Sequence, residues 1–184
     1  IKKSKDLRSH FDFDDPKLEK IYTEDFAFLK TKGVLEDLAS NPKEMVKDAK
    51  FRFSFQEREM ALVLVNRAMG SEQYQVFAQK EDGNWESLGF LEETSELMDV
   101  FLTKESVFFA HAPSKQTPII SITKNFQEYS LLQFDQIVDN HLYLQRVEEN
   151  KVILGSAPWD KKINESIYLL EEHKAKFLRK ERLD

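Results

Sequence analysis

The first third of the chain spaces its apolar residues as a helix does. Asp15 and Pro16 suit the capping position and the first turn of a helix. Apolar residues follow at helical spacing, at Leu18, Tyr22, Phe26 and Leu29. Asn41-Pro42 repeats this start signal ahead of a second, shorter apolar stripe. The pattern therefore predicts N-terminal helices, preceded by an extended arm over 1–14 that shows no periodicity.

From residue 51 the pattern takes the period of strands. Phe51, Phe53 and Phe55 alternate with polar residues, which places the three rings on one face of a strand. The continuous apolar run MALVLV over 60–65 is typical of a strand that is buried on both faces. A hairpin is predicted around Asp82-Gly83, because this dipeptide favours a tight turn. Further strands are predicted in SVFFAHA, PIISITK and EYSLLQF.

Two later segments are predicted as helices. A short one is expected over 94–103, and a long C-terminal one carries an apolar stripe at Ile163, Ile167, Leu170 and Phe177. The positive charge near its end would complement the helix dipole. The sequence thus predicts an α+β fold with N-terminal helices, a mainly antiparallel multi-stranded sheet and a long C-terminal helix. It predicts one domain over 15–184, with a sub-boundary near 104–117, and shows no internal repeat.

Composition narrows the function classes. The chain has 184 residues, of which 41% are hydrophobic, so it can form a core. The absence of cysteine excludes disulfides, thiol catalysis and cysteine-ligated zinc. A net charge of −6 argues against nucleic acid as a partner, because such binding depends on clustered lysine and arginine. No apolar run reaches the roughly 20 residues of a membrane helix. Because residue 1 is Ile rather than Met, the sequence leaves open a signal, an anchor, a membrane helix or another domain upstream, and we favour the bacterial periplasm over the cytoplasm.

The sequence contains no strong catalytic or cofactor motif. No phosphate-binding glycine loop and no paired-histidine metal motif occurs. The carboxylates of FDFDD over 11–15 could bind a hard cation, but the segment is interpreted as a solvated stretch that ends in a helix cap. His111 has Ser114 nearby, and is interpreted as a strand-end histidine rather than the base of a nucleophile pair. No catalytic residue, metal site or cofactor is therefore predicted.

The stretch QFDQIVDNHLYLQRVEENKVILGS over 133–156 predicts a hairpin, with Asn150 supplying a left-handed turn residue. Residues 117–156 resemble the small β-domain of type II secretion inner-membrane C components and of the related type IV pilus lipoprotein P. Leu144, Val147, Val152 and Leu154 would take the apolar positions of that family's hairpin, and Phe134–Val138 the preceding turn. The chain has Phe134-Asp135 where the family usually has a Gly-Asp pair. The resemblance implies a non-catalytic protein-protein module in an envelope assembly.

The leading hypothesis is a non-catalytic structural or protein-protein interaction component, which binds other protein subunits and needs no cofactor. The predicted contact regions are the amino-terminal arm and the hairpin, where the contact residues are Leu142, Tyr143, Leu144, Arg146, Val152 and Leu154. The alternative is a small-molecule-binding or hydrolytic enzyme domain whose site residues converge only in the fold. A nucleic-acid accessory factor is a third reading.

Overall fold

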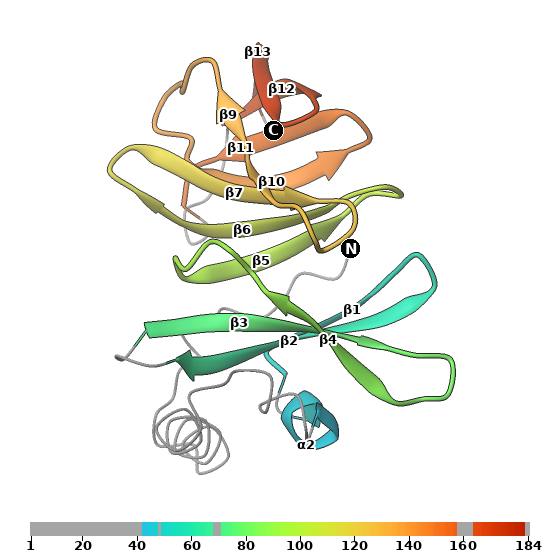
Figure 1. The fold of residues 1–184 in the computed structure, drawn as a ribbon. Coiled ribbons are helices and arrows are strands. Elements are labelled where there is room, and N and C mark those ends of the chain that lie inside the picture. Colours follow the sequence, from blue (N-terminus) through green and yellow to red (C-terminus); the bar gives the residue numbers. More distant parts are fainter. Residues whose placement is uncertain (1–41, 48, 68–70, 158–163, 183–184) are drawn as a thin grey trace. The chain divides into compact units, whose positions relative to one another are not determined.

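A computed structural model describes residues 42–47, 49–67, 71–157 and 164–182 (Figure 1). The predicted arm over 1–14, the helix that begins at Asp15 and the acidic stretch over 11–15 lie outside these residues. The described chain forms two compact units, and the boundary between them falls between Thr94 and Ser95. The predicted single domain over 15–184, with its sub-boundary near 104–117, stays a prediction.

The described residues of the first unit form one four-stranded antiparallel sheet and one short helix. Its elements are α2 (Pro42–Lys47), β1 (Phe51–Phe55), β2 (Arg58–Arg67), β3 (Ser71–Gln79) and β4 (Trp85–Phe90). The strands lie in chain order, each paired with the next (Figure 1). The predicted helix at Asn41-Pro42 is present as α2, and the hairpin predicted around Asp82-Gly83 joins β3 and β4.

The core of this unit explains why β2 is apolar along its whole length. Ala61, Val63 and Val65 share one face with Phe77 of β3, and this face packs against Met45 and Val46 of α2. Residues 60–65 are all buried, which confirms the prediction of a strand covered on both faces. Phe51 and Phe55 are buried as well, so these rings serve in packing and are not an exposed platform.

The second unit contains two sheets. Four strands form the first sheet, in the order β5 (Leu97–Leu102), β6 (Val107–Ser114), β7 (Thr117–Thr123) and β8 (Ser130–Leu131). Five strands form the second, in the order β10 (Tyr143–Glu148), β11 (Lys151–Gly155), β12 (Asn164–Glu171), β13 (Lys174–Arg182) and β9 (Gln133–Phe134). All neighbours are antiparallel except β9 and β13, which are parallel.

One hydrophobic core joins the two sheets of the second unit. The four-stranded sheet contributes Phe101, Phe108, Ala110, Ile120 and Ile122, and Leu132 joins them from the link between β8 and β9. The five-stranded sheet contributes Leu144, Val152, Leu154, Tyr168 and Ala175. These residues alternate along their strands with residues of the opposite face, as the two-residue period of a strand requires. The core therefore fixes which side chains of the five-stranded sheet face away from it.

The same meander occurs three times along the described chain. β1–β4, β5–β8 and β10–β13 are each four consecutive strands in antiparallel order, and their first strands begin at the equally spaced residues 51, 97 and 143. Four-stranded meanders in series are also the blades of β-propellers. The sequence shows no internal repeat because the meanders share an order of strands rather than a residue motif.

The predicted α+β class and the long C-terminal helix are wrong. The described residues are mostly strand, with α2 as their one helix, and β12 and β13 form a hairpin where the long helix was expected. The apolar run 167–170 belongs to a strand, and Ala175 and Phe177 alternate with lysines as strand residues do. The turn between the strands contains neither Gly nor Asn, and Glu172 takes a φ of 57° there. The usual sequence signal for a turn is therefore absent.

The short helix predicted over 94–103 is also wrong, because Leu97–Leu102 forms β5. A register shift between Leu97 and Asp99 places one extra residue in this strand. Such a bulge moves the later side chains to the opposite face. Apolar residues then fall at spacings that resemble those of a helix.

Candidate functional site

The predicted hairpin is present as β10 and β11, and Glu148 pairs with Lys151 across the turn. The left-handed turn residue is Glu149, with a φ of 45°, rather than Asn150 as predicted. Leu144, Val152 and Leu154 of the predicted contact set lie in the hydrophobic core. Leu142, Tyr143 and Arg146 are half-buried. In the predicted contact set, therefore, only the side chains of Leu142, Tyr143 and Arg146 reach the surface.

A buried glutamine explains the irregular start of the hairpin. The register of β10 shifts between Leu144 and Arg146, so that Gln145 has no partner across the strand pair. Its Nε2 donates to the carbonyl oxygens of Tyr143 at 3.3 Å and Ser156 at 3.1 Å. Its side chain lies over Gly155, where an added Cβ would come within 2.8 Å of the Gln145 Cγ. Gly155 therefore leaves the space that Gln145 fills.

Gly155→Ala is expected to lower the free energy of unfolding by about 1–2 kcal/mol, because the new methyl group displaces Gln145 from its hydrogen bonds. Hydrogen exchange at the β10 and β11 amides measures the change. In a Gln145→Ala background the same substitution should cost much less. An equal cost in both backgrounds would contradict a steric origin.

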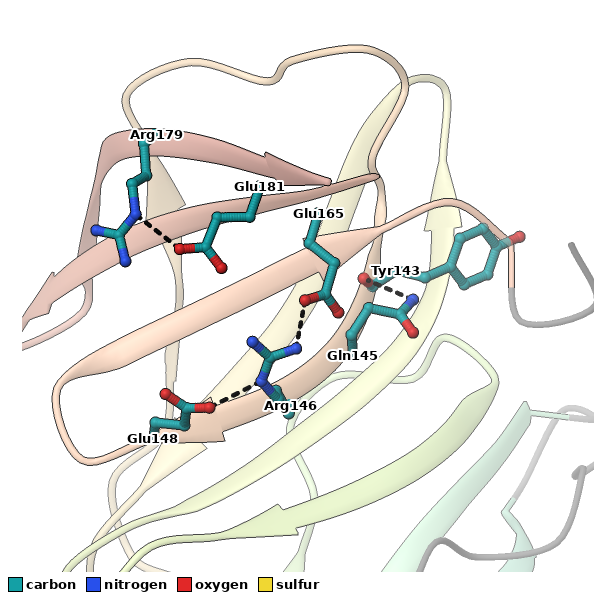
Figure 2. Close-up of polar contacts among 7 residues, drawn as sticks. All are labelled: Tyr143, Gln145, Arg146, Glu148, Glu165, Arg179 and Glu181. Carbon is teal, nitrogen blue, oxygen red and sulfur yellow. Dashed lines mark hydrogen bonds and ion pairs between the residues drawn. The ribbon is translucent and has the colours of Figure 1, made fainter. Parts of the chain in front are cut away.

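Arg146 is held between two carboxylates on the face of the sheet that points away from the core (Figure 2). Its Nε donates to Glu148 at 2.8 Å, and its Nη1 donates to Glu165 of β12. Only 3% of the Glu165 side chain is exposed, against 39% of the Arg146 side chain. The hydrogen bond to Glu148 is the main cause that raises the pKa of Arg146, with a further contribution from Glu165. Arg146 is thus a fixed cation with an open side.

The strand register places Arg146 in a row with a second arginine. The row crosses four neighbouring strands and consists of Arg146 of β10, Ile153 of β11, Ile167 of β12 and Arg179 of β13. Ile153 and Ile167 are buried, and the Arg179 Nε donates to Glu181 at 2.9 Å. We call this side of the five-stranded sheet the Arg146 face; its named members are Arg146, Glu148, Ile153, Glu165, Ile167, Arg179 and Glu181. Charges of both signs therefore surround a buried apolar centre.

The segment Gln133–His141, which we call the strap, connects the two sheets and runs along β13. The backbone nitrogens of Gln133 and Asp135 donate to the carbonyl oxygens of His173 and Ala175, at 2.8 and 3.0 Å. An Asp135 carboxylate oxygen accepts from the Phe177 nitrogen at 2.9 Å. Further along, Asp139 pairs with Lys180, and the Nδ1 of His141 lies 2.6 Å from the Ser166 Oγ. The strap therefore contacts β13 by its backbone at one end and by side chains at the other.

His141 makes the attachment of the strap sensitive to acid. Its side chain is 4% exposed, and burial lowers its pKa below the ordinary value of 6.5. Lys180 lowers the pKa further, whereas the carboxylates of Asp139 and Glu165 oppose the shift. Because the folded pKa is lowered, the stability linked to neutral His141 is present above pH 6.5 and is lost as the pH falls through the folded value.

We therefore expect the free energy of unfolding to fall between pH 6.5 and the lowered pKa of His141. Hydrogen exchange at the strap amides, followed across this range, provides the measurement. His141→Asn should remove the dependence in this window. Asp139 titrates in a lower range, because its hydrogen bond with Lys180 lowers its pKa from 3.8. A variant with unchanged acid dependence would show that another group is responsible.

Tyr168 gives the same unit an alkaline limit. Its hydroxyl donates to the Gln136 carbonyl of the strap at 2.7 Å, and burial raises its pKa from 10 to about 12. Because the folded pKa is raised, the protonated Tyr168 hydroxyl contributes about 2–3 kcal/mol to the free energy of unfolding. This contribution is fully present below pH 10 and is lost as the pH rises through 12. Unfolding measured across this range should show that loss, and Tyr168→Phe should lack it. An identical alkaline limb in the variant would contradict the assignment.

Among the described residues, the fold brings together two serine-histidine pairs that sequence spacing did not show. The His111 Nε2 lies 3.1 Å from the Ser121 Oγ of β7, and its Nδ1 lies 2.9 Å from the Ser95 carbonyl oxygen. The predicted neighbour Ser114 lies instead at the exposed end of β6. His111, Ser121, His141 and Ser166 are all buried. Each pair satisfies polar groups inside the fold, and a substrate in solvent does not reach either hydroxyl.

Neither metal ligands nor a membrane helix are found in the described part of the chain. No three histidine or acidic residues gather there as a metal site would require. None of the described helices is long and apolar enough to cross a membrane. Comparison with protein-family models and with curated proteins gives no match to this chain. The resemblance of 117–156 to the secretion and pilus domains therefore stays a prediction.

Proposed function

We propose that this chain is a non-catalytic protein-protein interaction component, which binds other protein subunits through the Arg146 face. The observation that carries the proposal is the guanidinium of Arg146. It is held in place by the buried carboxylate of Glu165 while 39% of the arginine side chain remains exposed. A side chain that is ordered before binding loses little entropy on association. Arginine is also among the residues that contribute most to protein-protein affinity.

The surroundings of Arg146 suit a protein partner. Glu148, Arg179 and Glu181 are partly exposed and alternate in sign. Such a pattern gives specificity, because a partner must present the complementary order of charges. The sheet supports these groups on paired strands, and sites on regular elements hold their geometry better than sites on loops.

We take an envelope assembly as the setting of this proposal, because the resemblance of residues 117–156 implies one. In the described residues, no specific observation favours the alternative of a hydrolytic enzyme. The two serine-histidine pairs in the described residues are buried and are used in packing. The contact set is accordingly reduced to Leu142, Tyr143 and Arg146, with Leu144, Val152 and Leu154 supporting the strands beneath them.

Co-purification from the native source tests the proposal. The tagged chain should retain specific protein subunits, and the double variant Arg146→Met with Glu165→Met should lose them by about tenfold or more. Removing both charges together avoids a lone buried carboxylate, so the fold is kept. The matched control is Arg58→Met with Glu86→Met, which removes an exposed ion pair of 2.7 Å from the other unit.

Two results would overturn the proposal. One is a wild-type chain that retains no subunit from its native source. The other is an Arg146–Glu165 double variant that retains the same subunits as the control while hydrogen exchange shows that both remain folded.

A further inference from the structure

We propose that the backbone edge of β13 over Leu178–Glu181, here called the open β13 edge, binds an acidic peptide segment that adds to the five-stranded sheet as a further strand. The inference rests on the proposed function, since it supplies the chemistry of one partner segment. It concerns the backbone edge of β13, where Arg179 and Glu181 also belong to the Arg146 face.

The pairing of β13 leaves this edge open. On the side away from β12, the two residues of β9 pair with Lys174 and Ala175. The Asp135 carboxylate then accepts from the Phe177 nitrogen. In the part of the chain that the structure describes, no strand pairs with Leu178–Glu181 on that side. An edge of this kind presents backbone donors and acceptors at strand spacing, which is what an added strand requires.

The charge of β13 selects the partner. Its nine residues include Lys174, Lys176, Arg179, Lys180 and Arg182 against the single acid Glu181, in a chain of net charge −6. Lysines on an edge strand discourage pairing with neutral or basic strands, including other copies of the same strand. An acidic strand is instead attracted, because each carboxylate would meet a cation across the new pair.

The strap shows that β13 already accepts an acidic extended segment. Its first residues pair in parallel with Lys174 and Ala175. The Asp135 carboxylate accepts a hydrogen bond from the Phe177 backbone nitrogen, and the Asp139 carboxylate forms an ion pair with Lys180. The Asp139 and Lys180 side chains are each about half exposed, so a competing carboxylate can exchange with Asp139 without opening the core. The strap is therefore an internal example of the chemistry that an external strand would use.

Leu178 adds an apolar contact at the same place. A register shift in the β12–β13 pair leaves it without a partner between Phe177 and Arg179, and it is 41% exposed. An added strand with an apolar residue at this level would cover it. The best-fitting segment is therefore extended and acidic, with apolar residues alternating between the acids.

Three synthetic peptides test the inference against the full chain. The first alternates valine and glutamate, the second replaces glutamate with lysine, and the third is the acidic peptide with alternate backbone nitrogens methylated. We expect the first to bind about tenfold or more tightly than the second at low salt, with the difference shrinking as salt is added. It should also protect the amides of Leu178–Glu181 from hydrogen exchange. The methylated peptide should lose this binding, because it keeps the charge but lacks the strand donors.

A pair of charge variants completes the test. Arg179→Glu with Lys180→Glu should reverse the preference between the acidic and basic peptides. The matched control, Lys104→Glu with Lys115→Glu, makes the same charge change at exposed residues away from β13 and should leave the preference unchanged. Equal binding of the methylated peptide, or protection confined to amides outside β13, would overturn the inference.

Failure of this inference can be told apart from failure of the proposed function. Absence of peptide binding with intact co-purification overturns the open β13 edge alone. Absence of co-purification from the native source overturns the proposed function.

Discussion

Replacement of Arg146 by alanine is expected to lower the free energy of unfolding of its unit by about 3 kcal/mol. The substitution leaves the Glu165 carboxylate, which is 3% exposed, without its arginine partner. A buried charge without a partner costs far more than the loss of an exposed ion pair. Hydrogen exchange at the β11 and β12 amides measures the loss in this unit alone.

Two comparisons isolate that cause. Arg146→Met with Glu165→Met should recover most of the loss, since two apolar side chains replace the pair. Arg58→Ala breaks an ion pair whose side chains are 44% and 43% exposed, and it should cost about 0–1 kcal/mol. If Arg146→Ala costs no more than Arg58→Ala, the Glu165 carboxylate does not depend on Arg146.

Tyr168→Ala is expected to cost about 4 kcal/mol, because it removes a fully buried ring from the centre of the shared core. The ring packs edge-on against Phe134 of the strap at 4.9 Å and against Phe177 of β13 at 5.6 Å between centroids. The cavity would also detach the strap, since the tyrosine hydroxyl donates to Gln136. Urea unfolding and exchange at the strap amides give the two readouts.

Tyr168→Phe is the matched control, because it keeps the ring and removes only the hydroxyl. It should cost about 1 kcal/mol, the usual contribution of one hydrogen bond. Leu178→Ala, at the exposed surface of β13, should change the stability little. Equal losses for Tyr168→Ala and Tyr168→Phe would show that the hydroxyl rather than ring packing carries the effect.

Where strands follow a simple period, the sequence predicts them well. β1, β2 and the β3–β4 hairpin lie where alternation, a continuous apolar run and Asp82-Gly83 place them. The β10–β11 hairpin is likewise present, because two apolar runs flank a short polar turn. These elements depend on neighbours that are close in sequence, so local pattern is sufficient.

Prediction fails where bulges and unusual turns break the local pattern. Bulges near Met98 and Leu178 shift the alternation in β5 and β13. Glu172 takes a left-handed conformation that is uncommon for a residue other than Gly or Asn. Both features are stabilised by sheet pairing and by the core, so they cannot be read from neighbouring residues. They account for the two predicted helices that are strands in the structure.

The candidate site depends even more on contacts distant in sequence. Arg146 belongs to the predicted contact set and its side chain is 39% exposed, but its partner Glu165 lies in a segment predicted as helix. Ser166 and Ser121 meet His141 and His111 only through strand register and packing. No spacing in the sequence brings these residues together.

The sequence by itself therefore determines that the chain is acidic, free of cysteine, able to form a core and rich in strands after residue 51. Only the tertiary structure decides that Arg146 is held by a buried carboxylate, that the strap pairs with the start of β13, and that the C-terminal segment is a hairpin. The physical reason is that apolar alternation and composition act over a few residues. Register, bulges and the partners of buried polar groups are set by the free energy of pairing whole strands around a shared core.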